Sequence, residues 1–119
     1  MAHYEQQLAG DVDAFIAHLD QQIAAGSISA KFEDTADLRL GTARTMVRVY
    51  ERYSVMGGNR VSLNVSVLAV DGTLAVSAIT SGGSQAVFWK LNTFGEEAFL
   101  KKAVQAIESF GGAVVPGQS

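Results

Sequence analysis

Between Arg44 and Thr80, apolar and polar residues alternate in three successive runs, which predicts three antiparallel strands joined as a meander. Residues 56–60 separate the first run from the second, and Asp71-Gly72 separates the second from the third. An Asp-Gly pair between two strands favours a type I′ turn, because both central residues of that turn have φ > 0. The meander indicates a fold class but names no reaction.

The two turns also predict which residues face each other. A tight Gly57-Gly58-Asn59 loop would place Val49 opposite Val67, and the Asp71-Gly72 turn would place Val67 opposite Val76. Both registers gather valines on one side, so we expect the odd-numbered residues of the first strand to face the core. The opposite, polar side is expected to carry Arg44, Arg48, Tyr50, Arg52, Ser62, Asn64, Ser66, Ser77 and Ile79.

Two amphipathic helices flank the predicted meander. Asp11 to Ala25 forms the first, with Asp11 as its N-cap and Gly26 ending it. The second runs from about Glu96 to Phe110, with Thr93 or Asn92 as its cap. The apolar stripes comprise Val12, Phe15, Ile16, Leu19 and Ile23 in the first helix, and Phe99, Leu100, Ala103, Val104, Ile107 and Phe110 in the second.

Three further segments read as strands. Ala2 to Ala9 is expected to form an edge strand carrying Tyr4 and Leu8, and Gln85 to Leu91 another strand. Ile28 to Leu40 is either one strand with an irregular middle or a hairpin with a broad turn. Helices and sheet each have one apolar side and must cover one another. The predicted fold class is therefore α+β, a two-layer sandwich with two helices on one face of an antiparallel sheet.

Composition narrows the class of protein further. A chain of 119 residues forms one domain, 1–119, in which residues from about 112 to 119 are expected to fray. The formal net charge of -3 disfavours nucleic acid and anionic membranes as partners. The absence of Cys excludes disulfides and thiolate chemistry, and two isolated histidines suggest neither a metal nor a cofactor. Because no secretory signal is apparent, we expect a cytoplasmic protein.

A candidate ligand site lies on the predicted polar side of the sheet. Arg44, Arg48 and Arg52 recur at every fourth residue, with Tyr50 between the last two and Asn64 opposite Arg52. Guanidinium groups suit a carboxylate or phosphate, although a solvated face or a subunit contact explains the same pattern. The glycine-rich segment 81–85 could present backbone N–H groups to an anion, although a loop between strands is the simpler interpretation. The candidate ligand-binding residues are Arg48, Tyr50, Arg52, Asn64, Ser84 and Gln85.

Glu51 breaks the apolar pattern of the predicted core side. An unpaired buried carboxylate is costly, so we expect Glu51 to pair with Arg60, Lys90 or a backbone N–H, or to lie at the sheet edge. The alternative is a general acid or base in a pocket between sheet and helices, with Arg48 or Arg52 anchoring an anion.

Several segments together resemble a family of small uncharacterised bacterial proteins, a domain of unknown function. The resemblance covers most of the chain and rests on Tyr50–Ser54, Gly57–Val65, Ala78–Phe88 and Asn92–Glu97. It implies a bacterial, cytoplasmic α+β protein and supplies no catalytic residue.

These observations favour a non-enzymatic module that binds a small molecule or associates with itself. Its polar sheet face would contact a second subunit, as in a homodimer, or a small anionic ligand. The alternative is a small enzyme whose pocket between sheet and helices uses Glu51 and the nearby arginines.

Overall fold

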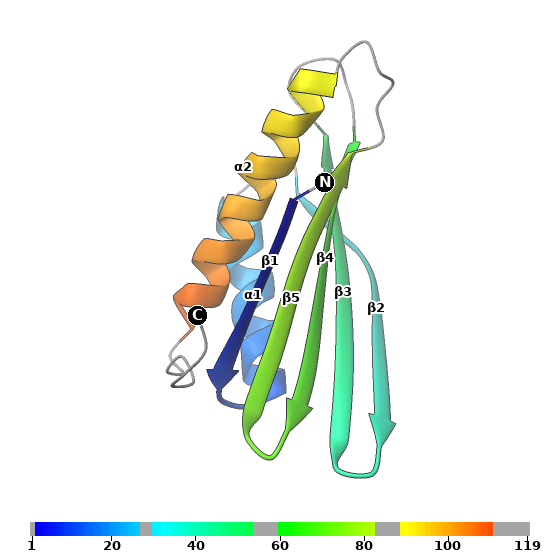
Figure 1. The fold of residues 1–119 in the computed structure, drawn as a ribbon, viewed down its shortest axis with the longest axis vertical. Coiled ribbons are helices and arrows are strands. Elements are labelled where there is room, and N and C mark those ends of the chain that lie inside the picture. Colours follow the sequence, from blue (N-terminus) through cyan, green and yellow to red (C-terminus); the bar gives the residue numbers. More distant parts are fainter. Residues whose placement is uncertain (1, 27–29, 54–59, 83–88, 111–119) are drawn as a thin grey trace.

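The computed structural model describes residues 2–26, 30–53, 60–82 and 89–110. These residues form five strands and two helices (Figure 1). In chain order the elements are β1 (Ala2–Ala9), α1 (Val12–Gly26), β2 (Lys31–Leu40), β3 (Ala43–Tyr53), β4 (Arg60–Val70), β5 (Thr73–Gly82) and α2 (Trp89–Glu108).

The strands form a single sheet in the order β1-β5-β4-β3-β2, and every neighbouring pair is antiparallel. β2 to β5 follow one another as a meander. β1 pairs with β5, so the first strand of the chain forms one edge of the sheet and β2 forms the other. Both helices lie on the same face of the sheet (Figure 1). The predicted α+β two-layer fold and the edge strand Ala2–Ala9 are thus confirmed.

Helix α1 matches its prediction closely. The Ala14 N–H donates to Asp11 Oδ2 at 2.9 Å, as an N-cap requires, and the whole predicted apolar stripe is buried. Helix α2 differs at its start, because it begins at Trp89 and not near Glu96. Residues 89–91 are therefore helical, which corrects the predicted strand there, and Asn92 and Thr93 lie inside the helix and do not cap it. The rest of that predicted strand falls outside the described residues, as does the expected tail.

β2 is one strand with an irregular middle, the first of the two predicted alternatives. Its register against β3 shifts between Phe32 and Asp34. All ten of its residues are exposed, because β2 lies at the sheet edge beyond the layer of helices.

The β4–β5 hairpin has the predicted register, with Val67 opposite Val76. Asp71 and Gly72 both have positive φ, 51° and 79°, as the type I′ turn demands. The β3–β4 register is different from the prediction, because Val67 faces Met46 and not Val49. This shift of three residues exchanges the two faces of β3.

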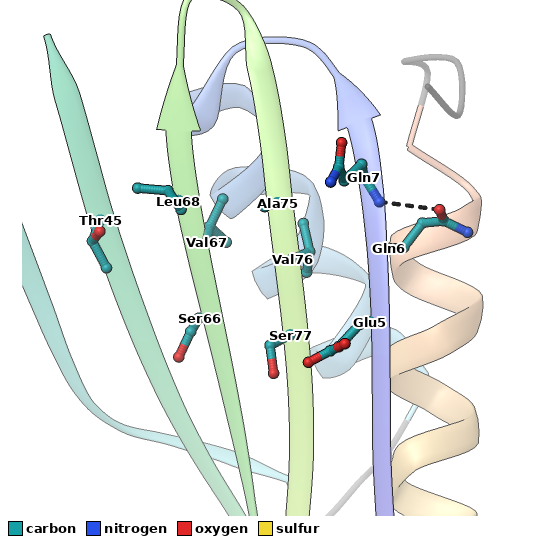
Figure 2. A pocket seen from close by; sticks show the side chains of 10 residues that line it. All are labelled: Glu5, Gln6, Gln7, Thr45, Ser66, Val67, Leu68, Ala75, Val76 and Ser77. Carbon is teal, nitrogen blue, oxygen red and sulfur yellow. Dashed lines mark hydrogen bonds between the residues drawn. The ribbon is translucent and has the colours of Figure 1, made fainter. Parts of the chain in front are cut away.

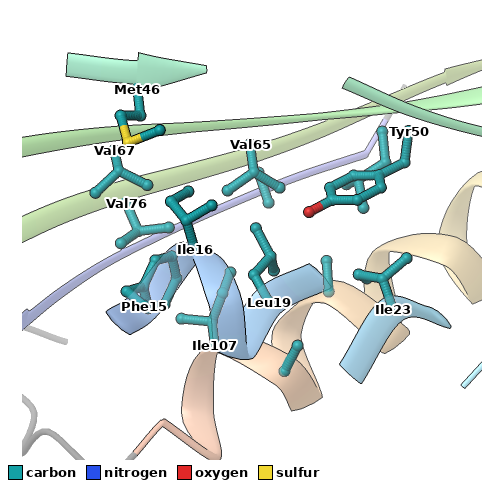
Figure 3. Packing of buried hydrophobic residues seen from close by; sticks show 14 of the residues in the cluster. Phe15, Ile16, Leu19, Ile23, Met46, Tyr50, Val65, Val67, Val76 and Ile107 are labelled. Atoms are coloured by element: carbon teal, nitrogen blue, oxygen red, sulfur yellow. The ribbon is translucent and has the colours of Figure 1, made fainter. Parts of the chain in front are cut away.

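The core lies between the sheet and the helices (Figure 3). Val65 and Val67 of β4 point inward as predicted, and α1 covers them with Phe15 and Leu19. On β3, however, the buried residues are Met46 and Tyr50, at 8% and 2% exposure. The even-numbered residues of β3 therefore face the helices, and the expectation that its odd-numbered residues face the core is wrong.

The exchange of faces on β3 has a physical cause. The predicted register would have placed the Glu51 carboxylate in the core, where an unpaired charge is costly. The observed register buries Met46 and the Tyr50 ring, and it places the guanidinium groups of Arg48 and Arg52 over the rings of Phe32 and Phe99. Long basic side chains tolerate such positions when the charged end meets a partner.

The entry to α1 is tightly packed against the end of α2. Gly10 has φ 152°, and a Cβ atom at this position would lie 2.7 Å from Phe110 Cε2. The Phe110 ring also packs edge-on against Phe15, with the centroids 5.2 Å apart. Glycine is therefore favoured here by backbone conformation, and a larger residue would also have to displace the Phe110 ring.

Candidate functional site

The predicted ligand-binding residues do not form one site, because they lie on opposite faces of the sheet. Arg48, Tyr50 and Arg52 face the helices, and Asn64 faces the other side, opposite Val49 and Ile79. Ser84 and Gln85 fall outside the described residues. The expected polar surface combining Arg48, Tyr50, Arg52 and Asn64 is thus corrected.

Arg48 and Tyr50 both bind Asp20 of α1, a residue that the sequence pattern did not single out. Arg48 donates from Nε to Asp20 Oδ1 at 3.2 Å and from Nη2 to Oδ2, and the Tyr50 hydroxyl also donates to Oδ1. The Arg48 guanidinium lies 4.3 Å from the Phe32 ring centroid, a cation–π contact. An anionic ligand at Arg48 would therefore have to compete with Asp20.

Arg44 forms a second link between β3 and α1. It donates to Asp13 of α1 and to Asp37 of β2, with N–O distances of 2.9 Å to each. These hydrogen bonds to Arg44 hold the pKa of both carboxyl groups below their ordinary value. The charge of Arg44, like that of Arg48, is therefore already compensated.

The two links show a spacing that could have been found in the sequence. Asp13 and Asp20 are seven residues apart on a helix, roughly 10 Å along its axis, and Arg44 and Arg48 are four apart on a strand, roughly 14 Å. Each pair lies on one side of its element, and the two lengths are similar. Two acidic residues that are two turns apart on a helix can therefore each pair with one of two basic residues that are four apart on a strand.

Tyr50 should make stability depend on alkaline pH. Burial, and then the hydrogen bond to Asp20, raise the pKa of its phenol above the ordinary 10. The unfolded chain loses this proton near pH 10, while the folded chain keeps it. The contribution of Tyr50 to the free energy of unfolding is therefore complete below pH 10 and falls as the pH rises further. We expect the free energy of unfolding to fall more between pH 9 and pH 11 in the wild type than in Tyr50→Phe, as measured by urea denaturation. Equal losses in the two proteins would contradict this assignment.

Arg52 also lies on the helix side of the sheet, at a half-buried position. Its guanidinium lies 4.8 Å from the centroid of the Phe99 ring in α2, and desolvation lowers its pKa. All three arginines of β3 thus interact with residues on the helix side of the sheet.

Glu51 lies on the face without helices. It forms an ion pair with Arg60 and accepts a hydrogen bond from Ser62 Oγ at 3.4 Å. The predicted partner Arg60 is thus found, but the predicted core position of Glu51 is wrong. The enzyme alternative placed Glu51 in a pocket between sheet and helices, and its position on the other side of the sheet removes the basis for that role.

The face of the sheet without helices, which we call the open face, carries most of the exposed apolar side chains. The structure describes six large apolar side chains as exposed, and all but Phe32 lie on the open face. These five are Leu38 (65%), Leu40 (86%), Leu68 (46%), Val70 (36%) and Ile79 (37%). As predicted, Ser62, Asn64, Ser66, Ser77 and Ile79 share this face. Its composition is thus mixed small polar and apolar, and not generally polar.

A shallow hollow of about 430 Å³ lies in the open face (Figure 2). Small side chains of three neighbouring strands line it, namely Thr45, Ser66, Ala75 and Ser77. Glu5 and Gln7 of β1 border it on one side, Thr45 of β3 lies on the other, and Leu68 of β4 is also among its lining residues. Within the described residues, no group of three or more acidic, histidine or cysteine side chains is placed to hold a metal ion.

Fold and site together define a small α+β protein whose helices cover one face of an antiparallel sheet and leave the other, partly apolar face open. The chain belongs to a family of unknown function, DUF6054, whose model matches residues 1–111. No curated protein and no solved structure matches the chain. Among the described residues, neither helix has the length and apolar content needed to cross a membrane.

Proposed function

We propose that this protein is a self-association module, which forms a homodimer by packing the open faces of two sheets together. The observation that supports this proposal is the gathering of exposed apolar side chains on that face. Isolated exposed apolar residues are normal on a protein surface, but several on one face mark an interaction site, and four of the five here (Leu38, Leu40, Leu68 and Val70) lie near the same end of the sheet.

The distribution of charge on the open face supports the same role. Its three central strands carry a single ion pair, Glu51–Arg60, at one end, and otherwise only uncharged side chains. Charged residues lie on the two outer strands, with Glu5 on β1 and Lys31 and Asp34 on β2. An uncharged centre and a charged rim are typical of protein–protein interfaces.

The open face is also large enough. Five strands spaced by ~4.8 Å, each of about ten residues rising ~3.3 Å, span roughly 800 Å². A stable interface buries about 800 Å² on each partner. Two such sheets can pack face to face at a separation of about 10 Å, as in β-sandwiches.

A second copy fits this face better than a charged partner does, because the open face carries both projecting apolar side chains and a hollow that can receive such side chains. Leu68 and Ile79 project from it, and the hollow lined by small side chains lies beside Leu68. A two-fold axis brings the same patch of both copies together, so projecting side chains of one copy can enter the hollow of the other.

The test is to place a charge on β4, the middle strand of this face. We expect Leu68→Glu to weaken dimerisation by at least about 100-fold, or about 2.7 kcal/mol, since the carboxylate would lose its water in the interface. Gln105→Glu, which adds the same charge on an exposed position of α2, should leave dimerisation unchanged. Sedimentation velocity over a concentration series measures both, and circular dichroism verifies that each variant is folded.

Two results would contradict the proposal. One is a wild-type protein that stays monomeric at its highest soluble concentration, in which case the open face serves a different partner. The other is a dimer that Leu68→Glu and Gln105→Glu affect equally, in which case the interface lies elsewhere.

A further inference from the structure

On the helix side of the sheet, a separate cavity of about 230 Å³ lies between the C-terminal half of α1 and the strands β2 and β3. Its apolar walls are Ile23 and Ala24 of α1, Ala30, and the ring of Phe32. Asp20, Arg48 and Tyr50 form its polar side. We propose that this cavity binds a neutral, single-ring aromatic carboxamide or lactam.

The volume of the cavity suits about one ring. An apolar protein cavity of about 150 Å³ accommodates benzene. The additional volume here leaves room for one small substituent inside the cavity. The mostly apolar lining with a few converging polar groups is typical of small-molecule sites.

The polar side favours a neutral ligand. Asp20 and Arg48 form an ion pair whose charges cancel, and their side chains are only 35% and 16% exposed. A charged ligand would bring an uncompensated charge into a largely apolar cavity and would compete with this pair. A carboxylate is therefore rejected and a neutral group is accepted.

The same pair offers one hydrogen-bond acceptor beside one donor. Asp20 Oδ2 accepts from Arg48 Nη2 and retains a further lone pair for a ligand N–H. The Arg48 guanidinium has five N–H donors, of which Asp20 takes two, so it can also donate to a ligand oxygen. An adjacent N–H and C=O, the arrangement in a carboxamide or a lactam, complements this pair.

The experiment is a two-dimensional ¹H–¹⁵N NMR titration of the full chain with benzamide, benzoate and toluene. We expect benzamide to shift the backbone signals of Ala24 and Ala30 and to bind at least ten-fold more tightly than benzoate or toluene. Phe32→Ala, at a half-exposed position, should weaken benzamide binding at least five-fold without changing sedimentation. Gln22→Ala, on an exposed position of α1 outside the cavity lining, should bind as the wild type does.

Three results would overturn this inference. If benzoate binds as tightly as benzamide, the cavity does not select neutral ligands. If toluene binds as tightly as benzamide, the Asp20–Arg48 pair does not contribute to ligand binding. If Phe32→Ala binds benzamide unchanged, the ligand lies elsewhere. None of these results bears on dimerisation, because the cavity and the open face lie on opposite sides of the sheet.

Discussion

Asp20→Ala is expected to lower the free energy of unfolding by about 2–3 kcal/mol, because its carboxylate accepts hydrogen bonds from two groups on the helix side of the sheet. Without it, the hydroxyl of Tyr50, a residue only 2% exposed, and the Arg48 guanidinium lose their charged acceptor. Urea denaturation at neutral pH measures the change.

Asp13→Ala is the matched control for this prediction. Asp13 also binds an arginine of β3 from the same helix, but its side chain is 66% exposed. Exposed ion pairs contribute little, because water replaces the lost partner. Similar losses in the two variants would show that burial does not distinguish the two links, contrary to the structure.

Phe15→Ala is expected to have the largest effect on stability, a loss of about 3–5 kcal/mol, because it leaves a cavity in the centre of the core. Phe15 is fully buried and packs against Phe110 of the segment after α2. Phe32→Ala removes the same ring from a position that is 52% exposed, and its cost should be below about 1 kcal/mol. A comparable loss at both positions would place the core elsewhere. Thermal and urea denaturation test both variants.

The sequence predicts an element correctly where its local pattern allows only one structure. The stripe of α1 has only one apolar side, and Asp71-Gly72 allows one tight turn, so both elements agree with the structure. β3 is different because both of its sides contain apolar residues, with Met46 and Tyr50 on one and Val47 and Val49 on the other. Alternation alone cannot choose between them.

What determines the orientation of β3 is tertiary and lies far away in the sequence. Asp13 and Asp20 of α1 pair with Arg44 and Arg48, which allows the arginines to face the helices, and Glu51 pairs with Arg60 on the other side. The connection between β3 and β4 also contains more residues than the predicted Gly57-Gly58-Asn59 loop, since the pairing of the two strands ends at Tyr53 and Arg60. Because loop length fixes the register of a hairpin, an error in the predicted loop length shifts the predicted register by the same amount.

The start of α2 was missed for a related reason. The run through Val87, Phe88 and Trp89 is rich in residues favoured in strands, but strand propensity is easily overridden by tertiary packing. The open face was predicted correctly in its serines and Asn64. Its exposed leucines Leu38 and Leu40 could be assigned to it only once the pairing of β2 with β3 was known, whereas the alternation along β4 that places Ser62, Asn64 and Ser66 there also places Leu68.

An isotope-filtered NOE experiment on mixed labelled and unlabelled chains detects only contacts between two copies, and it tests directly whether the open faces pair. We expect contacts between copies from the methyl groups of Leu68 and Ile79. Intermolecular contacts confined to the helices or to the edge strands, or none at all, would contradict it.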